Sequence, residues 1–194
     1  MKRRDAAIVK HLIENKNQEL NILMISKALK MDYKNVYVIV KRLEKEALLK
    51  LESFGQSRRV KLITKMHPLI FEAEYIRKEE LLKNKNLAVM LDHFKSHLKS
   101  KHYVLLIFGS YAKKKQTKLS DIDLLFIVPE GEEELFEQKV NTAANLLPLP
   151  IHHFVFSETQ FLNMAGAQKP NVGQEAIKNN IILYGIETYY ELTG

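Results

Sequence analysis

Residues 103–128 read YVLLIFGSYAKKKQTKLSDIDLLFIV, and this stretch decides the fold of the second half of the chain. It contains two unbroken apolar runs of strand length, Tyr103–Phe108 and Leu124–Val128. The first run ends abruptly at Gly109-Ser110. Short apolar runs bounded by turn residues are typical of buried strands. The stretch therefore predicts a strand, a turn and a second strand.

Two carboxylates, Asp121 and Asp123, stand where the second strand begins. Side chains at positions i and i+2 of a strand point to the same side, so we expect these carboxylates to converge. Like charges held close together repel each other unless a hard cation lies between them. Since Mg²⁺ takes one or two carboxylates together with substrate phosphates, the pair predicts a site for a nucleoside triphosphate and its metal.

The Gly109-Ser110 turn has the chemistry that phosphates need. A glycine lets the backbone approach an anion closely, and N–H groups at the start of a following helix attract negative charge. The Ser110 hydroxyl can donate a hydrogen bond to a terminal phosphate. Four lysines after the turn would surround the phosphates with positive charge: Lys113, Lys114, Lys115 and Lys118.

Gly109-Ser110, the ten residues that follow, and the segment DIDLL at 121–125 together resemble the signature of the DNA polymerase β-type nucleotidyltransferases. The resemblance is closest to their minimal, stand-alone members, and it spans residues 85–192. It implies a small mixed α/β core that passes a nucleoside monophosphate from a nucleoside triphosphate, such as ATP, to an acceptor. It also implies that Asp121 and Asp123 are catalytic and hold Mg²⁺ or Mn²⁺. The nucleotide-binding residues would be Gly109, Ser110 and Lys113.

Active members of that family usually carry a third carboxylate on the next core strand, where it binds a second metal or takes a proton from the attacking hydroxyl. The corresponding segment here, Pro150–Phe156, holds no Asp or Glu. His152 or His153 could substitute, because imidazole can act as a general base near neutral pH and suits Zn²⁺ or Mn²⁺ better than Mg²⁺. Glu158, just past the strand, is a second alternative. A third is that catalysis is weakened or lost.

Positive charge is concentrated in the first third of the chain. The whole sequence carries a formal net charge of +7, of which residues 1–65 contribute +9 and residues 66–194 contribute −2. Lys and Arg gain affinity for nucleic acids because they release the counterions condensed on phosphates. The asymmetry therefore predicts a nucleic-acid-binding module joined to a near-neutral one, with a merely solvated basic surface as the alternative.

Three helical patterns followed by a hairpin pattern make up the basic module. Apolar residues at i, i+3 and i+4 spacing predict helices over residues 5–15, 22–29 and 33–46. Strand-like runs over residues 48–52 and 59–63 flank a turn that contains Gly55. This order resembles the winged helix-turn-helix family, in which the third helix enters the DNA major groove and the wing touches the backbone.

The resemblance implies nucleic-acid contacts from the third helix and from the wing. One face of that helix is basic and aromatic, and two arginines lie near the tip of the hairpin. The residues expected to contact DNA or RNA are Lys34, Tyr37, Lys41, Arg42, Lys45, Arg58 and Arg59. Ala47 departs from the pattern, because many members have a glycine before the first wing strand. A winged helix that binds protein is the alternative.

The chain is therefore expected to be an α/β (α+β) protein with three parts. These are a winged helix-turn-helix domain over residues 1–65, a linking helix over 66–84 and a mixed-sheet nucleotidyltransferase domain over 85–194. The middle part suits either a connecting helix or the seam of a homodimer.

Composition narrows the chemistry further. The absence of cysteine excludes a disulfide scaffold, a thiolate zinc site and a cysteine nucleophile. No apolar run reaches the roughly 18 residues of a membrane span, so we expect a cytoplasmic protein without a membrane partner.

Two functions follow from these motifs. The first is a nucleotidyltransferase that uses a nucleoside triphosphate and a divalent metal, with the winged helix binding nucleic acid. The second is a DNA-binding transcriptional regulator of an antitoxin-like kind, whose transferase domain senses nucleotide or is inactive.

Overall fold

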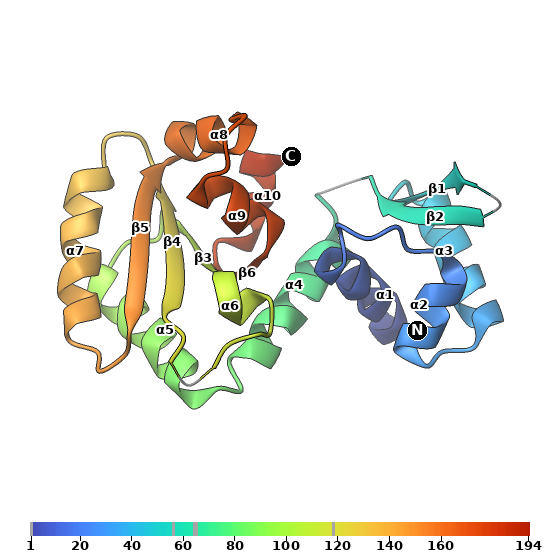
Figure 1. The fold of residues 1–194 in the computed structure, drawn as a ribbon, viewed down its shortest axis with the longest axis horizontal. Helices are drawn as coiled ribbons and strands as arrows, with labels where there is room; N and C mark the ends of the chain where they lie inside the picture. Colours follow the sequence, from blue (N-terminus) through green and yellow to red (C-terminus); the bar gives the residue numbers. More distant parts are fainter. Residues whose placement is uncertain (1, 56, 64–65, 118) are drawn as a thin grey trace. The chain divides into compact units, whose positions relative to one another are not determined.

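The computed structural model describes residues 2–55, 57–63, 66–117 and 119–194, and it divides into two compact units (Figure 1). The first unit runs from the N-terminus to Arg77, and the second covers Lys78–Thr193. The division falls inside helix α4 (Pro68–Leu81), in the region where the sequence predicts a linking helix. In the described part of the chain, no helix is both long and apolar enough to cross a membrane.

The first unit begins with three helices and a two-stranded hairpin. These elements are α1 (Lys2–Glu14), α2 (Ile22–Leu29), α3 (Tyr33–Lys45), β1 (Leu49–Phe54) and β2 (Ser57–Leu62). Their order is the predicted one and is compatible with a winged helix-turn-helix. Asn21 caps α2 and Asp32 caps α3, because each side chain accepts hydrogen bonds from backbone N–H groups in the first turn of its helix.

The apolar stripes that predict the three helices form the core of this unit. The buried residues include Ile8, Val9, Leu12, Ile25, Val36, Ile39, Val40 and Leu43. Burying one face of α3 leaves Tyr33 and Tyr37 on its other face, 47% and 43% exposed. Ala47, just past α3, has a left-handed φ of 55°, a conformation that a glycine would adopt with less strain.

A four-stranded mixed sheet forms the centre of the second unit. Its strands are β3 (Val104–Phe108), β4 (Ile122–Val128), β5 (Ile151–Ser157) and β6 (Asn180–Tyr184), in the spatial order β5-β4-β3-β6. Strands β4 and β5 run parallel, whereas β3 is antiparallel to both β4 and β6. The expected mixed α/β class is confirmed.

Helices cover both faces of this sheet (Figure 1). The helices are α5 (Lys85–Leu98), α6 (Gly109–Ala112), α7 (Glu133–Asn145), α8 (Glu158–Gly166), α9 (Val172–Lys178) and α10 (Ile186–Thr193). On β4, Leu124 and Phe126 pack with α5 and α7, and Leu125 and Ile127 pack with α8, α9 and α10. Because side chains alternate along a strand, Asp123 lies on the same face of the sheet as Leu125.

Candidate active site and nucleic-acid face

Gly109 and Asp123 lie against each other where the end of β3 meets the start of β4. Gly109 has a left-handed φ of +65°, and a Cβ added to it would overlap the Asp123 carboxylate oxygen Oδ2. The position therefore requires glycine for two reasons, its backbone conformation and the close approach of a carboxylate. The predicted phosphate turn and one of the two predicted metal ligands are thus in direct contact.

The negative charge of Asp121 acts on the Asp123 carboxyl. Asp121 is exposed just before β4, and the Asp123 side chain, the second residue of β4, is 27% exposed. Burial raises the pKa of the Asp123 carboxyl, contacts with His152 lower it, and the negative charges of Asp121 and Glu175 raise it again. A bound cation would relieve this repulsion, which fits the predicted role of the pair.

The donor set suits a hard metal held jointly with substrate. Among the described residues, no three His, Asp or Glu side chains are grouped so that they could hold a metal ion by themselves. Asp121 and Asp123 supply oxygen ligands, and Mg²⁺ commonly completes its octahedron with waters and substrate phosphates. The residues present therefore fit a Mg²⁺ ion that arrives with a nucleotide better than a permanently bound structural metal.

The turn after β3 is the first turn of the short helix α6. The backbone N–H of Lys113 donates to Gly109 O, and that of Lys115 donates to Ser110 O at 2.9 Å. The Lys113 side chain, predicted to bind nucleotide, instead forms an ion pair with Glu175, with 2.5 Å between Nζ and Oε1. Lys118, the last of the predicted lysines, lies outside the described residues.

Glu175 is a site residue that the sequence patterns do not identify. It belongs to α9, which packs on β3, and its charge reaches both Lys113 and Asp123. It follows Lys113 by 62 residues, so no local spacing rule connects the two. Only the tertiary packing of α9 brings this carboxylate to the site.

The two histidines of β5 point to opposite faces of the sheet. His152 is in register with Asp123, and its Nδ1 lies 3.6 Å from Asp123 Oδ1. His153 alternates to the α7 side, where burial lowers its pKa and Glu137 raises it. Its Nδ1 is buried without a hydrogen-bond partner in the described part of the chain. Only His152 is therefore placed to act beside Asp123.

Glu158 does not reach this site, so the alternative that it replaces the third carboxylate is wrong. Glu158 directly follows β5 and lies six residues beyond His152. At ~3.3 Å per residue along the strand, this separates the two residues by about 20 Å. Glu158 instead lines a small cavity of about 170 Å³ with Lys101, Val104 and Pro129, at the opposite end of β3 and β4.

Several of the predicted nucleic-acid contacts already bind carboxylates. Lys41 Nζ lies 2.7 Å from Glu44 Oε2. Arg42 Nη2 lies 2.8 Å from the buried Asp5, and Nη1 of the same guanidinium lies 3.2 Å from Glu46. Two of the four cations of α3, Lys41 and Arg42, are therefore already paired within the unit.

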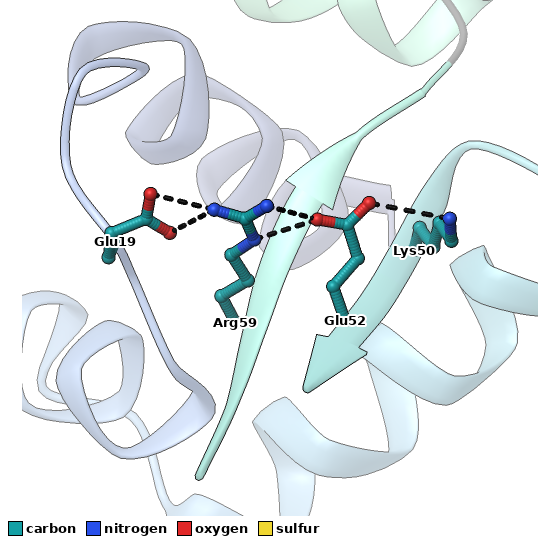
Figure 2. A network of polar contacts seen from close by, with 4 residues as sticks. All are labelled: Glu19, Lys50, Glu52 and Arg59. Carbon is teal, nitrogen blue, oxygen red and sulfur yellow. Dashed lines mark hydrogen bonds and ion pairs between the residues drawn. The ribbon is translucent and has the colours of Figure 1, made fainter. Parts of the chain in front are cut away.

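Arg59 is the centre of a longer network on the hairpin (Figure 2). Its Nη1 lies 2.7 Å from Glu19 Oε1, and its Nε donates to Glu52 Oε2 at 2.7 Å. Lys50 Nζ adds a contact of 3.4 Å to the same Glu52 carboxylate. The neighbouring Arg58 is an exposed cation that forms no ion pair with any described residue, and the same holds for Lys34 and Lys45 of α3.

The second unit contains a match to a known protein family. Residues 93–188 match the model of the family described as "Polymerase beta, Nucleotidyltransferase". No curated protein and no solved structure matches the chain. The family match covers β3 to β6 with the Gly109-Ser110 turn and both aspartates, and it supports the resemblance inferred from the sequence signature.

Proposed function

We propose that the second unit, a nucleotidyltransferase domain by its family match, transfers a nucleoside monophosphate from a nucleoside triphosphate to an acceptor hydroxyl. The observation that carries the proposal is the contact between Gly109 and Asp123, with Asp121 beside it. This contact joins a turn suited to phosphate to an acidic pair suited to Mg²⁺.

Each residue of the site has a distinct role in this reaction. Asp121 and Asp123 would hold Mg²⁺, which supplies charge neutralisation for the triphosphate and the leaving group when bound. The Ser110 hydroxyl donates to a phosphate oxygen, and Lys113 adds positive charge once it leaves Glu175. The acceptor oxygen attacks the α-phosphorus, the bond from that phosphorus to the bridging oxygen breaks, and pyrophosphate leaves.

We propose that His152 accepts the proton of the acceptor hydroxyl. It occupies the register position opposite Asp123, on the strand where active members of the family usually carry a carboxylate. Its side chain is 62% exposed, so an acceptor can approach it from solvent. A histidine imidazole can act as a general base at neutral pH.

We further propose that the first unit binds nucleic acid through α3 and the hairpin. The exposed cations Lys34, Lys45 and Arg58 support this, together with the net charge of +9 on residues 1–65. A Lys45→Ala, Arg58→Ala variant should bind DNA or RNA more weakly and with a shallower dependence on salt, by about one unit of slope per lost phosphate contact. Unchanged affinity and slope would contradict this part of the proposal.

The transferase is tested by label transfer. The full chain is incubated with each α-³²P-labelled nucleoside triphosphate, Mg²⁺ or Mn²⁺, and either total RNA or total protein. We expect incorporation that is lost in the Asp121→Asn, Asp123→Asn variant. The Asp92→Asn variant, which changes an exposed aspartate of α5, should retain it. Incorporation that survives the double substitution would refute the assignment of the site.

The second candidate is a regulator that binds nucleotide without transferring it. The observation that favours it is the absence of a carboxylate from β5 at the position opposite Asp123. Calorimetric binding of a nucleoside triphosphate with Mg²⁺, abolished by the double aspartate substitution and accompanied by no label transfer, would establish this alternative over the transferase.

A further inference from the structure

The first unit contains a groove of about 420 Å³ between α3, the start of α2 and the hairpin. Tyr33, Tyr37 and Lys41 line it at four-residue spacing along α3, which places them in one row on the helix. Leu51 and Arg58 of the hairpin line the facing side. The volume falls within the range of about 300–1,000 Å³ that is usual for small-molecule sites.

The aromatic part of the groove faces solvent. Tyr33 and Tyr37 are among the exposed large residues of the chain, and neither belongs to the buried core of the unit. Their rings are nearly parallel, with an interplanar angle of 24° and centroids 6.4 Å apart. Two adjacent, similarly oriented ring faces beside cations are the arrangement on which unpaired nucleobases stack.

The charges around the groove are fewer than the composition suggests. Lys41, Arg42 and Arg59 each bind at least one carboxylate of the same unit. The Asp32 side chain accepts hydrogen bonds from the N–H groups of Lys34 and Asn35, so a carboxylate already occupies the N-terminus of α3. Binding of a duplex depends mainly on phosphate contacts, and the groove itself is lined by only two cations among the described residues, Lys41 and Arg58.

We propose that this groove binds unpaired nucleotides of single-stranded nucleic acid, with bases stacked on Tyr37 and Tyr33 and phosphates paired with Arg58 and with Lys41 once it leaves Glu44. The inference deepens the nucleic-acid binding proposed above and rests on it. The two phosphate contacts of the groove contribute about −1.4 to the salt slope for a single strand, at ~0.7 per contact, and contacts outside the groove, such as Lys45, add to it. Stacking accounts for the remaining affinity and depends little on salt.

The test measures fluorescence anisotropy of the full chain with labelled 15-nucleotide oligomers. The probes are single-stranded DNA, single-stranded RNA and the matching DNA duplex, all in EDTA so that metal-dependent binding at the transferase site does not contribute. We expect either single strand to bind at least tenfold more tightly than the duplex. The comparison of the DNA and RNA strands shows which sugar the groove accepts.

Substitution of Tyr37 distinguishes stacking from general electrostatics. Tyr37→Leu should weaken single-strand binding by about 5- to 150-fold, the factor that corresponds to ~1–3 kcal/mol per stacked base. Tyr37→Phe retains a ring and should bind nearly as the parent does. Tyr75→Leu, at a tyrosine of α4 that is 56% exposed and outside the groove, is the matched control. Both sites are exposed, so the thermal midpoints of the three variants should agree.

Two results would overturn the inference, and they differ in whether nucleic-acid binding by the first unit is also refuted. Preference for the duplex, with equal affinities for Tyr37→Leu and the parent chain, would refute the groove but retain nucleic-acid binding by the unit. No binding of any of the three oligomers would refute both, while the label-transfer assay of the second unit would be unaffected.

Discussion

Replacement of Gly109 by alanine tests the contact on which the candidate active site depends. The left-handed φ of +65° should cost an alanine about 1–2 kcal/mol. The new Cβ would also overlap Asp123 Oδ2, and overpacking of this kind typically costs about 1–3 kcal/mol. An alanine also lowers the conformational entropy of the unfolded chain, which stabilises the folded state by about 0.4–1 kcal/mol. The net loss in unfolding free energy should be about 1–4.5 kcal/mol.

Gly131 provides a control that separates these two contributions. It has a φ of +81°, also left-handed, but an added Cβ would meet no atom within 4 Å. Gly131→Ala should therefore lower the unfolding free energy by only about 0–1.5 kcal/mol. Urea denaturation of both variants, monitored by circular dichroism, measures the difference, and calorimetry with a nucleoside triphosphate and Mg²⁺ measures its effect on binding.

A double-mutant cycle completes this test. In an Asp123→Ala background the carboxylate is absent, so Gly109→Ala should cost no more than Gly131→Ala does. If Gly109→Ala and Gly131→Ala lose the same free energy in the parent chain, and nucleotide binding is unchanged, then Gly109 and Asp123 are not in contact and the reasoning fails.

The remaining predictions concern single contacts. Ala47→Gly should raise the unfolding free energy by about 0.5–1 kcal/mol, because it relieves a left-handed alanine, and a lower thermal midpoint would contradict this. Glu175→Gln should tighten nucleotide binding about two- to fivefold by releasing Lys113, and Lys113→Ala should cancel the gain; weaker binding would mean that Glu175 itself is needed. Arg59→Ala should lower the thermal midpoint and Arg58→Ala should not, whereas equal midpoints would show that the carboxylates around Arg59 contribute no stability.

Local patterns were sufficient for most of the architecture. The apolar runs around Gly109-Ser110 correspond to β3 and β4, and the helical spacings of the first third correspond to α1, α2 and α3. These features depend on residues close together in the chain, where periodicity and turn chemistry carry the information. The expectation that the Asp121 and Asp123 side chains converge stays a prediction, because Asp121 lies just before β4 and strand alternation does not fix its direction.

Contacts between distant segments were not predictable in the same way. Periodicity offered His152 and His153 equally, and only the parallel pairing of β4 with β5 places His152 beside Asp123. Glu175 comes to the site through the packing of α9, and Glu158 is excluded because it lies at the far end of β5. Spacing along the sequence does not predict contacts between segments that are far apart in the chain.

The charges of the first unit show the same limit. Counting Lys and Arg predicted a broad basic face, but Arg42 and Arg59 are bound to carboxylates from other segments of the unit. Net charge is a property of composition, whereas the number of cations left for phosphate depends on the folded structure.

Because of the network around Arg59, salt should affect the hairpin in two ways, through its contacts with nucleic acid and through its own ion pairs. A two-stranded hairpin is only marginally stable alone, and here the guanidinium and the bond from Val60 N to Leu20 O at 2.7 Å fasten it to the segment before α2. Added salt screens the attraction between cations and phosphates, and it also weakens the ion pair between Arg59 and Glu19. If the first unit binds nucleic acid as proposed, a plot of log affinity against log salt should therefore curve downward at high salt instead of remaining straight, because the hairpin loses its attachment.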